Sequence, residues 1–199
     1  MRLPTLLKIG LLSSLATVLM FYQIPLFTSF LKYDLSEVPA LIGAFALGPA
    51  AGAAIVILKN MLFTVARFSP EELVGIPLNT VAGLTLVLTS GALYRLRKTK
   101  KMALASLGVG ALAMTAVMIP ANFVLYPIFA HAFLGLDITG PQVLGFILTV
   151  ITPYNLIKGA LTSTVTFLVY KRFSRVLKME PLWEVTQELP SKSPIHTTR

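Results

Sequence analysis

The chain has 199 residues, of which 55% are hydrophobic and 13% are charged, and its formal net charge is +9. Because soluble domains carry about 25% charged residues, this composition favours an integral membrane protein. The basic residues fall in short clusters between apolar runs, which argues against nucleic-acid binding. The absence of cysteine excludes disulfides, thiolate metal ligands and cysteine nucleophiles.

The apolar runs predict an all-α membrane protein with six transmembrane helices, since a spanning helix needs roughly 20 mainly apolar residues. The first run has no clear signal-peptide cleavage site after it, so we expect it to be retained as a helix. Gly48-Pro49 is a turn signal between the second and third runs. The expected helices span about Leu6–Phe27, Val38–Leu47, Ala50–Val65, Leu73–Leu96, Ala103–Phe133 and Pro141–Phe173.

The alternative is five crossings, in which the second and third runs form one kinked helix. Basic clusters within residues 2–8, 95–101 and 171–178 argue against five crossings. The three clusters lie on the same side of the membrane only if the chain crosses it an even number of times between one cluster and the next. The positive-inside rule then places both termini in the cytoplasm. Residues 1–178 are expected to form the membrane domain, and residues 179–199 a polar, loosely ordered cytoplasmic tail.

Lys158 and Asn155 lie three residues apart in the last apolar run, so they are predicted to share one helix face. A lysine near the middle of a spanning helix costs at least about 2.5 kcal/mol, which one asparagine does not offset. Pro153 removes a backbone donor just before them. Ammonium and amide groups on this face predict a site for a neutral ligand rich in carbonyl and hydroxyl groups.

Similar polar residues recur in other helices. Asn122 and Asn79 each follow a proline by two residues, and Lys59 precedes Asn60. For Asn60 and Asn79, hydrogen bonding between helices and ligand binding are equally plausible. Lys59 is expected near the external end of its helix, where its ammonium would snorkel towards water.

The first loop is the second candidate region. Ser36 is expected to cap the helix that follows, with Glu37 near the positive end of that helix. The apolar residues Phe27, Phe30 and Leu31 would otherwise leave an exposed patch, so we interpret the loop as a lid over an apolar pocket.

Three stretches together resemble a known family: "LKYDLSEVPALIGAFALGPAAGAAIVILKNML" from residue 31, "ANF" at 121–123 and "PYNLIKG" at 153–159. They resemble the riboflavin-specific substrate-binding subunits (S components) of energy-coupling factor (ECF) vitamin transporters, over residues 5–175. The resemblance implies a six-helix fold with both termini inside. It also implies a pocket, open to the outside, between the first loop and helices one, four, five and six.

The resemblance further implies roles for particular residues. Asn122, Asn155 and Lys158 would hydrogen-bond the flavin, and the loop would close over it. The implied loop residues are Leu31, Lys32, Tyr33, Asp34, Leu35, Glu37 and Ala40. Of these, Leu35 and Ala40 are also compatible with plain helix packing.

The implied partners are riboflavin, a membrane scaffold subunit and two cytoplasmic ATPases, within the plasma membrane of a prokaryote. In many members of this family the first helix presents small residues four apart to the scaffold, usually a pair of alanines, from which this sequence departs. Gly10 with Ser14, or Ser13 with Thr17, has that spacing here, although such spacing also permits close packing within one protein.

Other classes remain open at this level. They are an S component or permease for another flavin or vitamin, and an intramembrane enzyme that uses Lys158 as a base. No pair of acidic residues within one helix supports the enzyme, so we expect no catalytic residues. The resemblance implies no cofactor, with riboflavin as the transported ligand. A single histidine, His131, near the external end of the fifth run does not make a metal site.

Overall fold

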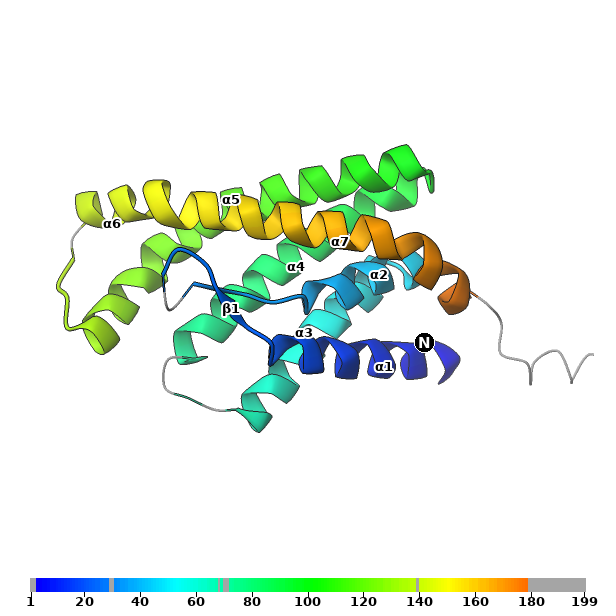
Figure 1. The fold of residues 1–199 in the computed structure, drawn as a ribbon, viewed down its shortest axis with the longest axis horizontal. Helices are drawn as coiled ribbons and strands as arrows, with labels where there is room; N and C mark the ends of the chain where they lie inside the picture. Colours follow the sequence, from blue (N-terminus) through cyan, green and yellow to red (C-terminus); the bar gives the residue numbers. More distant parts are fainter. Residues whose placement is uncertain (1–2, 29–30, 68, 70–71, 139, 179–199) are drawn as a thin grey trace, which may run out of the picture.

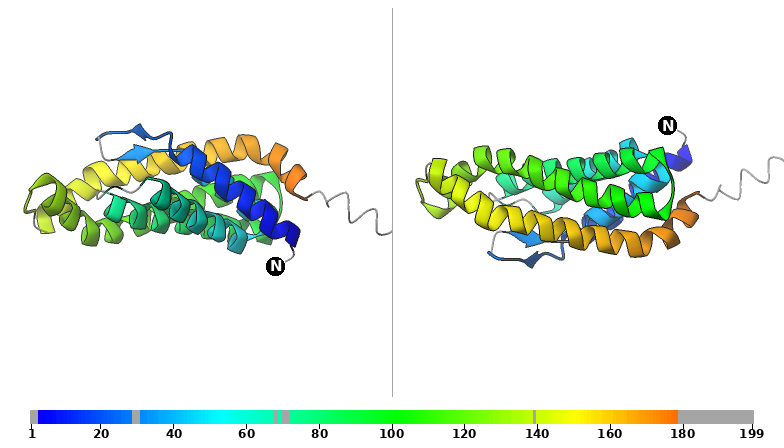
Figure 2. Two further views of the ribbon diagram at one scale, coloured as in Figure 1. Left: turned by 90° about the horizontal axis from the view of Figure 1, so that it is seen from below. Right: turned by 90° about the horizontal axis from the view of Figure 1, so that it is seen from above.

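A computed structural model describes residues 3–28, 31–67, 69, 72–138 and 140–178, so Phe30 and the tail expected at residues 179–199 lie outside it. The helices lie side by side in an elongated bundle (Figures 1 and 2). The helices are α1 (Leu3–Met20), α2 (Glu37–Leu47), α3 (Pro49–Ala66), α4 (Glu72–Leu96), α5 (Lys100–Phe129), α6 (Gly140–Phe146) and α7 (Thr152–Lys178). Two short strands, β1 (Ile24–Pro25) and β2 (Lys32–Tyr33), pair antiparallel in the first loop.

Five helical stretches in the described residues are long and apolar enough to cross a membrane. They are Leu3–Met20, Pro49–Ala66, Glu72–Leu96, Lys100–Leu134 and Gly140–Tyr170. The sixth apolar helix, α2, has only 11 residues and is almost wholly buried among its neighbours. Large apolar side chains are exposed on the outside of the bundle, as lipid contact requires.

The predicted reversal between the second and third runs is confirmed. Gly48 has a φ of 108°, a backbone conformation that favours glycine, and Pro49 begins α3. As a result, the start of α1, the turn between α4 and α5 and the end of α7 gather at one end of the bundle (Figures 1 and 2). The three basic clusters of the sequence are carried by these segments.

Two π-helical turns interrupt the last two long helices. One, η1 (Ala130–Leu134), follows Pro127, and the other, η2 (Ile147–Ile151), comes just before Pro153. At η2, Pro153 removes a backbone donor and crowds the carbonyl of Thr149, four residues earlier, and a wider turn relieves this conflict. The turn at η2 lies immediately before the Asn155 and Lys158 segment.

Candidate functional site

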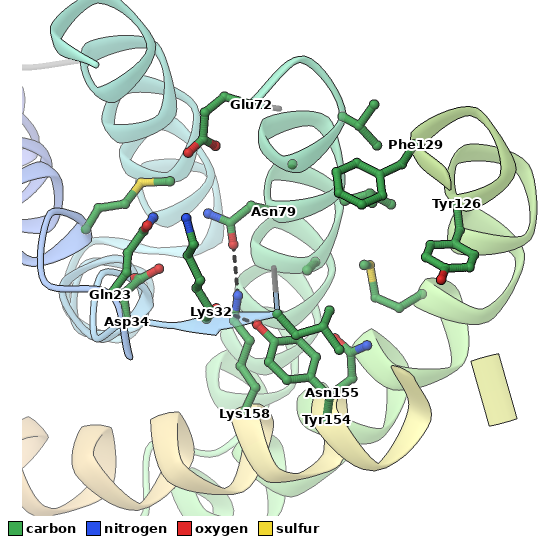
Figure 3. Close-up of a pocket in the computed structure, with 17 residues that line it drawn as sticks. Gln23, Lys32, Asp34, Glu72, Asn79, Tyr126, Phe129, Tyr154, Asn155 and Lys158 are labelled. Carbon is green, nitrogen blue, oxygen red and sulfur yellow. Dashed lines mark hydrogen bonds between the residues drawn. The ribbon is translucent and has the colours of Figure 1, made fainter. Parts of the chain in front are cut away.

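A cavity opens between the first loop and helices α4, α5 and α7 (Figure 3). The first loop and the start of α4 lie in the half of the bundle away from the termini (Figure 1). The space inside the cavity is about 1010 Å³, a figure that includes open solvent at the mouth. Most of the lining surface is apolar, although about half of the lining residues carry polar or charged groups. The lining residues are Met20, Gln23, Leu31, Lys32, Asp34, Glu72, Val74, Gly75, Leu78, Asn79, Ala82, Met118, Tyr126, Phe129, Tyr154, Asn155 and Lys158.

Lys158 rises from α7 into this cavity and is 5% exposed (Figure 3). Its Nζ donates a hydrogen bond of 2.9 Å to Oδ1 of Asn79 on α4. The position of α7 here is fixed by close packing, since a Cβ on Gly159 would lie 2.7 Å from that of Ala111 on α5. The buried ammonium is therefore held against the cavity wall by a polar partner that the sequence analysis left undecided.

Asn155 lines the cavity beside Lys158, whereas Asn122 on α5 is buried but is not among the lining residues. Each side-chain amide donates to the carbonyl four residues earlier, Asn155 to Ile151 at 2.9 Å and Asn122 to Met118 at 2.8 Å. That bond uses only one of the hydrogen-bonding groups of each amide. Both amides are thus oriented by their own helices.

The first loop reaches the cavity through Leu31, Lys32 and Asp34. Oδ1 of Asp34 accepts the backbone N–H of Ser36 at 2.8 Å, which fixes the turn into α2. Tyr33 is buried, and burial raises the pKa of its phenol, so the ring stays neutral.

The remaining loop candidates lie elsewhere. Leu35 is 36% exposed, Ala40 is fully buried in the helical core, and neither lines the cavity. Glu37 is also buried away from the lining, and its Oε1 accepts from Nζ of Lys59 at 2.8 Å.

Two expectations about this region are wrong. Lys59 does not snorkel: it is 0% exposed and is paired with Glu37. Ser36 stands at the N-cap position of α2, but its side chain makes no capping bond. Its Oγ instead accepts from Nζ of Lys59 at 2.5 Å, because a buried ammonium requires several acceptors.

Several lining residues were not singled out from the sequence. The hydroxyl of Tyr154 donates to the carbonyl of Lys32 at 2.5 Å, which ties the loop to α7. Tyr126 and Phe129 form an aromatic wall on α5 (Figure 3). Tyr126 also stacks on Phe146 of α6 at a centroid distance of 4.5 Å. For Tyr154 the signal was its place directly before Asn155 in a polar segment.

The charges that line the cavity balance. Lys32 and Lys158 are matched by Asp34 and Glu72. This balance of formal charges fits a neutral ligand, which the polar groups of the site can hydrogen-bond. His131 lies outside the lining, exposed, with Nδ1 2.7 Å from Oδ1 of Asp137.

On α1, the two candidate pairs of small residues face opposite ways. Gly10 and Ser14 are exposed, and a Cβ at Gly10 would meet no atom within 4 Å. Ser13 and Thr17 are buried, and Oγ1 of Thr17 lies 3.5 Å from the carbonyl oxygen of Lys59 on α3. The buried pair is therefore used within the bundle.

Fold and cavity together define a multi-pass membrane protein with a small-molecule pocket in one half of the bundle. Residues 5–170 match the family of substrate-specific components of ECF transporters, and the chain belongs to this family. A solved S component of a bacterial ECF transporter is 33% identical, with a TM-score of 0.72 over 88% of this chain and 98% of that chain. A structure of ThiT from Listeria monocytogenes, 18% identical with a TM-score of 0.60, supports the fold alone.

Curated relatives cover nearly the same length. The riboflavin transporter RibU of Staphylococcus aureus (strain TCH60) is 35% identical over 87% of this chain and 92% of its own. The riboflavin transporter FmnP of Bacillus subtilis (strain 168) is 30% identical over 85% of this chain and 92% of its own. Both relatives are transporters rather than enzymes.

Proposed function

We propose that the chain binds riboflavin at the outer face of a prokaryotic plasma membrane, for ATP-driven uptake. The observation that carries the proposal is the convergence of Lys158, Asn155 and Asn79 on a cavity with an aromatic wall. Riboflavin is neutral and combines a flat apolar ring with carbonyl and hydroxyl groups, which suits this balance of surfaces. The names of the two curated relatives support the same ligand.

The ligand-binding set that we propose combines Asn155 and Lys158 with the loop residues Leu31, Lys32 and Asp34. Asn122, which lies on α5 one turn after the lining residue Met118, would join the set by changing its side-chain rotamer. The loop would close over the ring, while the polar groups satisfy its carbonyl edge or the ribityl chain.

The remaining residues of the implied set take an indirect part in this proposal. Tyr33, Leu35, Glu37 and Ala40 belong to the loop or to the start of α2 and would hold the lid in place.

We propose that both termini are cytoplasmic, so that the cavity faces outward. The basic segments gather at one end of the bundle and the cavity lies in the half away from it, which supports this orientation. After loading, the subunit would associate with a membrane scaffold subunit and two cytoplasmic ATPases. The exposed pair Gly10 and Ser14 is the docking surface that fits this step, because small residues let two helices approach closely.

The test is to purify the protein in mild detergent and record its absorbance at the flavin bands. A yellow ligand released by denaturation and identified as riboflavin supports the proposal. A colourless protein that does not quench the fluorescence of added riboflavin overturns it. Lys158→Met should fold but bind riboflavin far more weakly, and wild-type affinity in this variant would contradict the assignment of the pocket.

A further inference from the structure

Four polar side chains form a continuous hydrogen-bonded chain that starts at the ammonium of Lys158. Its Nζ donates to Oδ1 of Asn79 at 2.9 Å, and Nδ2 of Asn79 donates to Oδ1 of Asn60 at 3.4 Å. Nδ2 of Asn60 donates to Oγ1 of Thr80 at 2.8 Å, and this hydroxyl donates to the carbonyl of Ile76 at 2.8 Å. This series of hydrogen bonds connects the helices α7, α4 and α3.

The chemistry at the two ends forces the direction of this chain. Lys158 has only donors, so Asn79 must turn its oxygen towards the ammonium and its NH₂ group towards Asn60. At the other end, the hydroxyl hydrogen of Thr80 is used by the carbonyl of Ile76, so its oxygen accepts and Asn60 must offer its NH₂ group there. The constraints at the Lys158 end and at the Thr80 end therefore agree. The Asn79 oxygen faces Lys158 and its NH₂ group faces Asn60, while the Asn60 oxygen faces Asn79 and its NH₂ group faces Thr80.

Asn60 differs from the other members in its place. It is 3% exposed and is not among the cavity-lining residues, whereas Asn79 and Lys158 are. The link from Asn60 to Asn79 is the longest of these hydrogen bonds, and it holds the NH₂ end of the Asn79 amide while the oxygen end meets the ammonium. An Asn79 side chain freed from Asn60 would still turn its oxygen towards the ammonium, but it would lose the contact on its other side that holds it in one position.

We propose that Asn60 is a positioning residue for ligand binding, which acts through Asn79 on the ammonium of Lys158. This inference rests on the proposed riboflavin site and deepens it. Asn60 holds the Asn79 oxygen towards Lys158, and the ammonium therefore stands at a fixed point of the cavity wall. A ligand carbonyl then meets a donor that is already placed, and loses less freedom on binding.

The experiment is a double-mutant cycle on riboflavin affinity with Asn60→Leu and Lys158→Met. Asn60→Leu alone should weaken binding about tenfold, the size expected if the displaced ammonium no longer makes its hydrogen bond to the ligand. In the Lys158→Met background the same change should alter affinity by less than about twofold, because the group that it positions is gone. Equal losses in both backgrounds overturn the proposal and leave Asn60 a packing residue.

Two further variants guard against a fold defect. Thr80→Val removes the acceptor for Asn60 and should weaken riboflavin binding. Thr80→Ser keeps the hydroxyl and should bind riboflavin as the wild-type protein does. Thr64→Val is the matched control on α3, since Oγ1 of Thr64 donates only to the backbone carbonyl of Asn60 at 2.7 Å. Loss of affinity in Thr64→Val equal to that in Thr80→Val overturns the proposal.

The same cycle on the unfolding temperature without ligand separates this inference from the proposed function. If wild-type protein does not bind riboflavin, the proposed function fails. In that case, non-additive changes of the unfolding temperature in Asn60→Leu and Lys158→Met would still support the coupling of Asn60 to the Lys158 ammonium through the hydrogen-bonded chain. Additive changes would overturn it.

Discussion

The Nζ atom of Lys59 on α3 lies 2.8 Å from Oε1 of Glu37 at the start of α2, and both side chains are fully buried. The same ammonium bonds Oγ of Ser36, whose backbone N–H is held by the cavity residue Asp34. The base of the first loop is thus anchored to the bundle by one ion pair. Lys32 lies in the part of the loop that precedes Ser36 and Glu37, outside the segment that the ion pair holds.

Breaking this ion pair should be costly. Lys59→Met leaves a buried carboxylate without its cation and should lower the free energy of unfolding by about 3–5 kcal/mol. Replacing both partners, Glu37→Met with Lys59→Met, should recover most of that loss, because no buried charge remains. The measurement is unfolding in detergent, with the exposed Lys101→Met as control. A Lys59→Met protein as stable as the control would contradict the role of the pair.

Tyr154→Phe should speed ligand release. The hydroxyl of Tyr154 bonds the carbonyl of Lys32, and its loss removes about 0.5–1.5 kcal/mol from the contact that ties the loop to α7. We expect riboflavin to dissociate roughly two- to tenfold faster, with little change in the association rate. Stopped-flow fluorescence measures both rates. Tyr22→Phe, at a residue 74% exposed, is the control, and equal release rates in the two variants would refute the tie.

Gly159→Ala should disturb the site by displacing α7 from α5. The new Cβ would lie 2.7 Å from Cβ of Ala111, so the helices must separate, at a cost of about 1–3 kcal/mol. Affinity for riboflavin should fall because Lys158 moves with its helix. The second substitution Ala111→Gly should restore both properties, and Gly145→Ala, which meets no atom within 4 Å, should change neither. Failure of the rescue would show that the close approach is not the cause.

Much of the fold follows from the sequence because lipid imposes simple demands. Run lengths located the long helices, and Gly48-Pro49 identified the reversal, since a positive φ and a proline at a helix start are local signals. The three-residue spacing placed Lys158 and Asn155 on one helix face, and the cost of burying a lysine indicated a polar cavity there. Both residues line the cavity in the structure. Each of these inferences used only residues that lie close together in the sequence.

What the sequence could not provide are pairings between distant elements. Lys59 was expected to reach water because its partner Glu37 lies 22 residues away and meets it only through the packing of α2 on α3. The bond from Lys158 to Asn79 spans 79 residues. Such contacts depend on the tilt and rotation of whole helices, which an apolar run does not fix.

The outward pair on α1 gives the last prediction. Gly10→Leu or Ser14→Leu should leave riboflavin binding by the isolated subunit unchanged, because both positions face away from the bundle and the cavity. Uptake by cells that contain the complete transporter should fall sharply, since a large side chain blocks the close approach of a partner helix. Ser13→Leu should instead destabilise the subunit, because Ser13 is 1% exposed within the bundle.

Gly108→Leu is the matched control for this experiment. Gly108 also meets no atom within 4 Å, but it lies on α5 rather than on α1. Uptake that falls in Gly10→Leu and persists in Gly108→Leu assigns the partner to α1, because both variants add the same side chain to an exposed helix position. Uptake that is preserved in both Gly10→Leu and Ser14→Leu would remove this face of α1 from the docking surface, and the partner would then have to approach another side of the bundle.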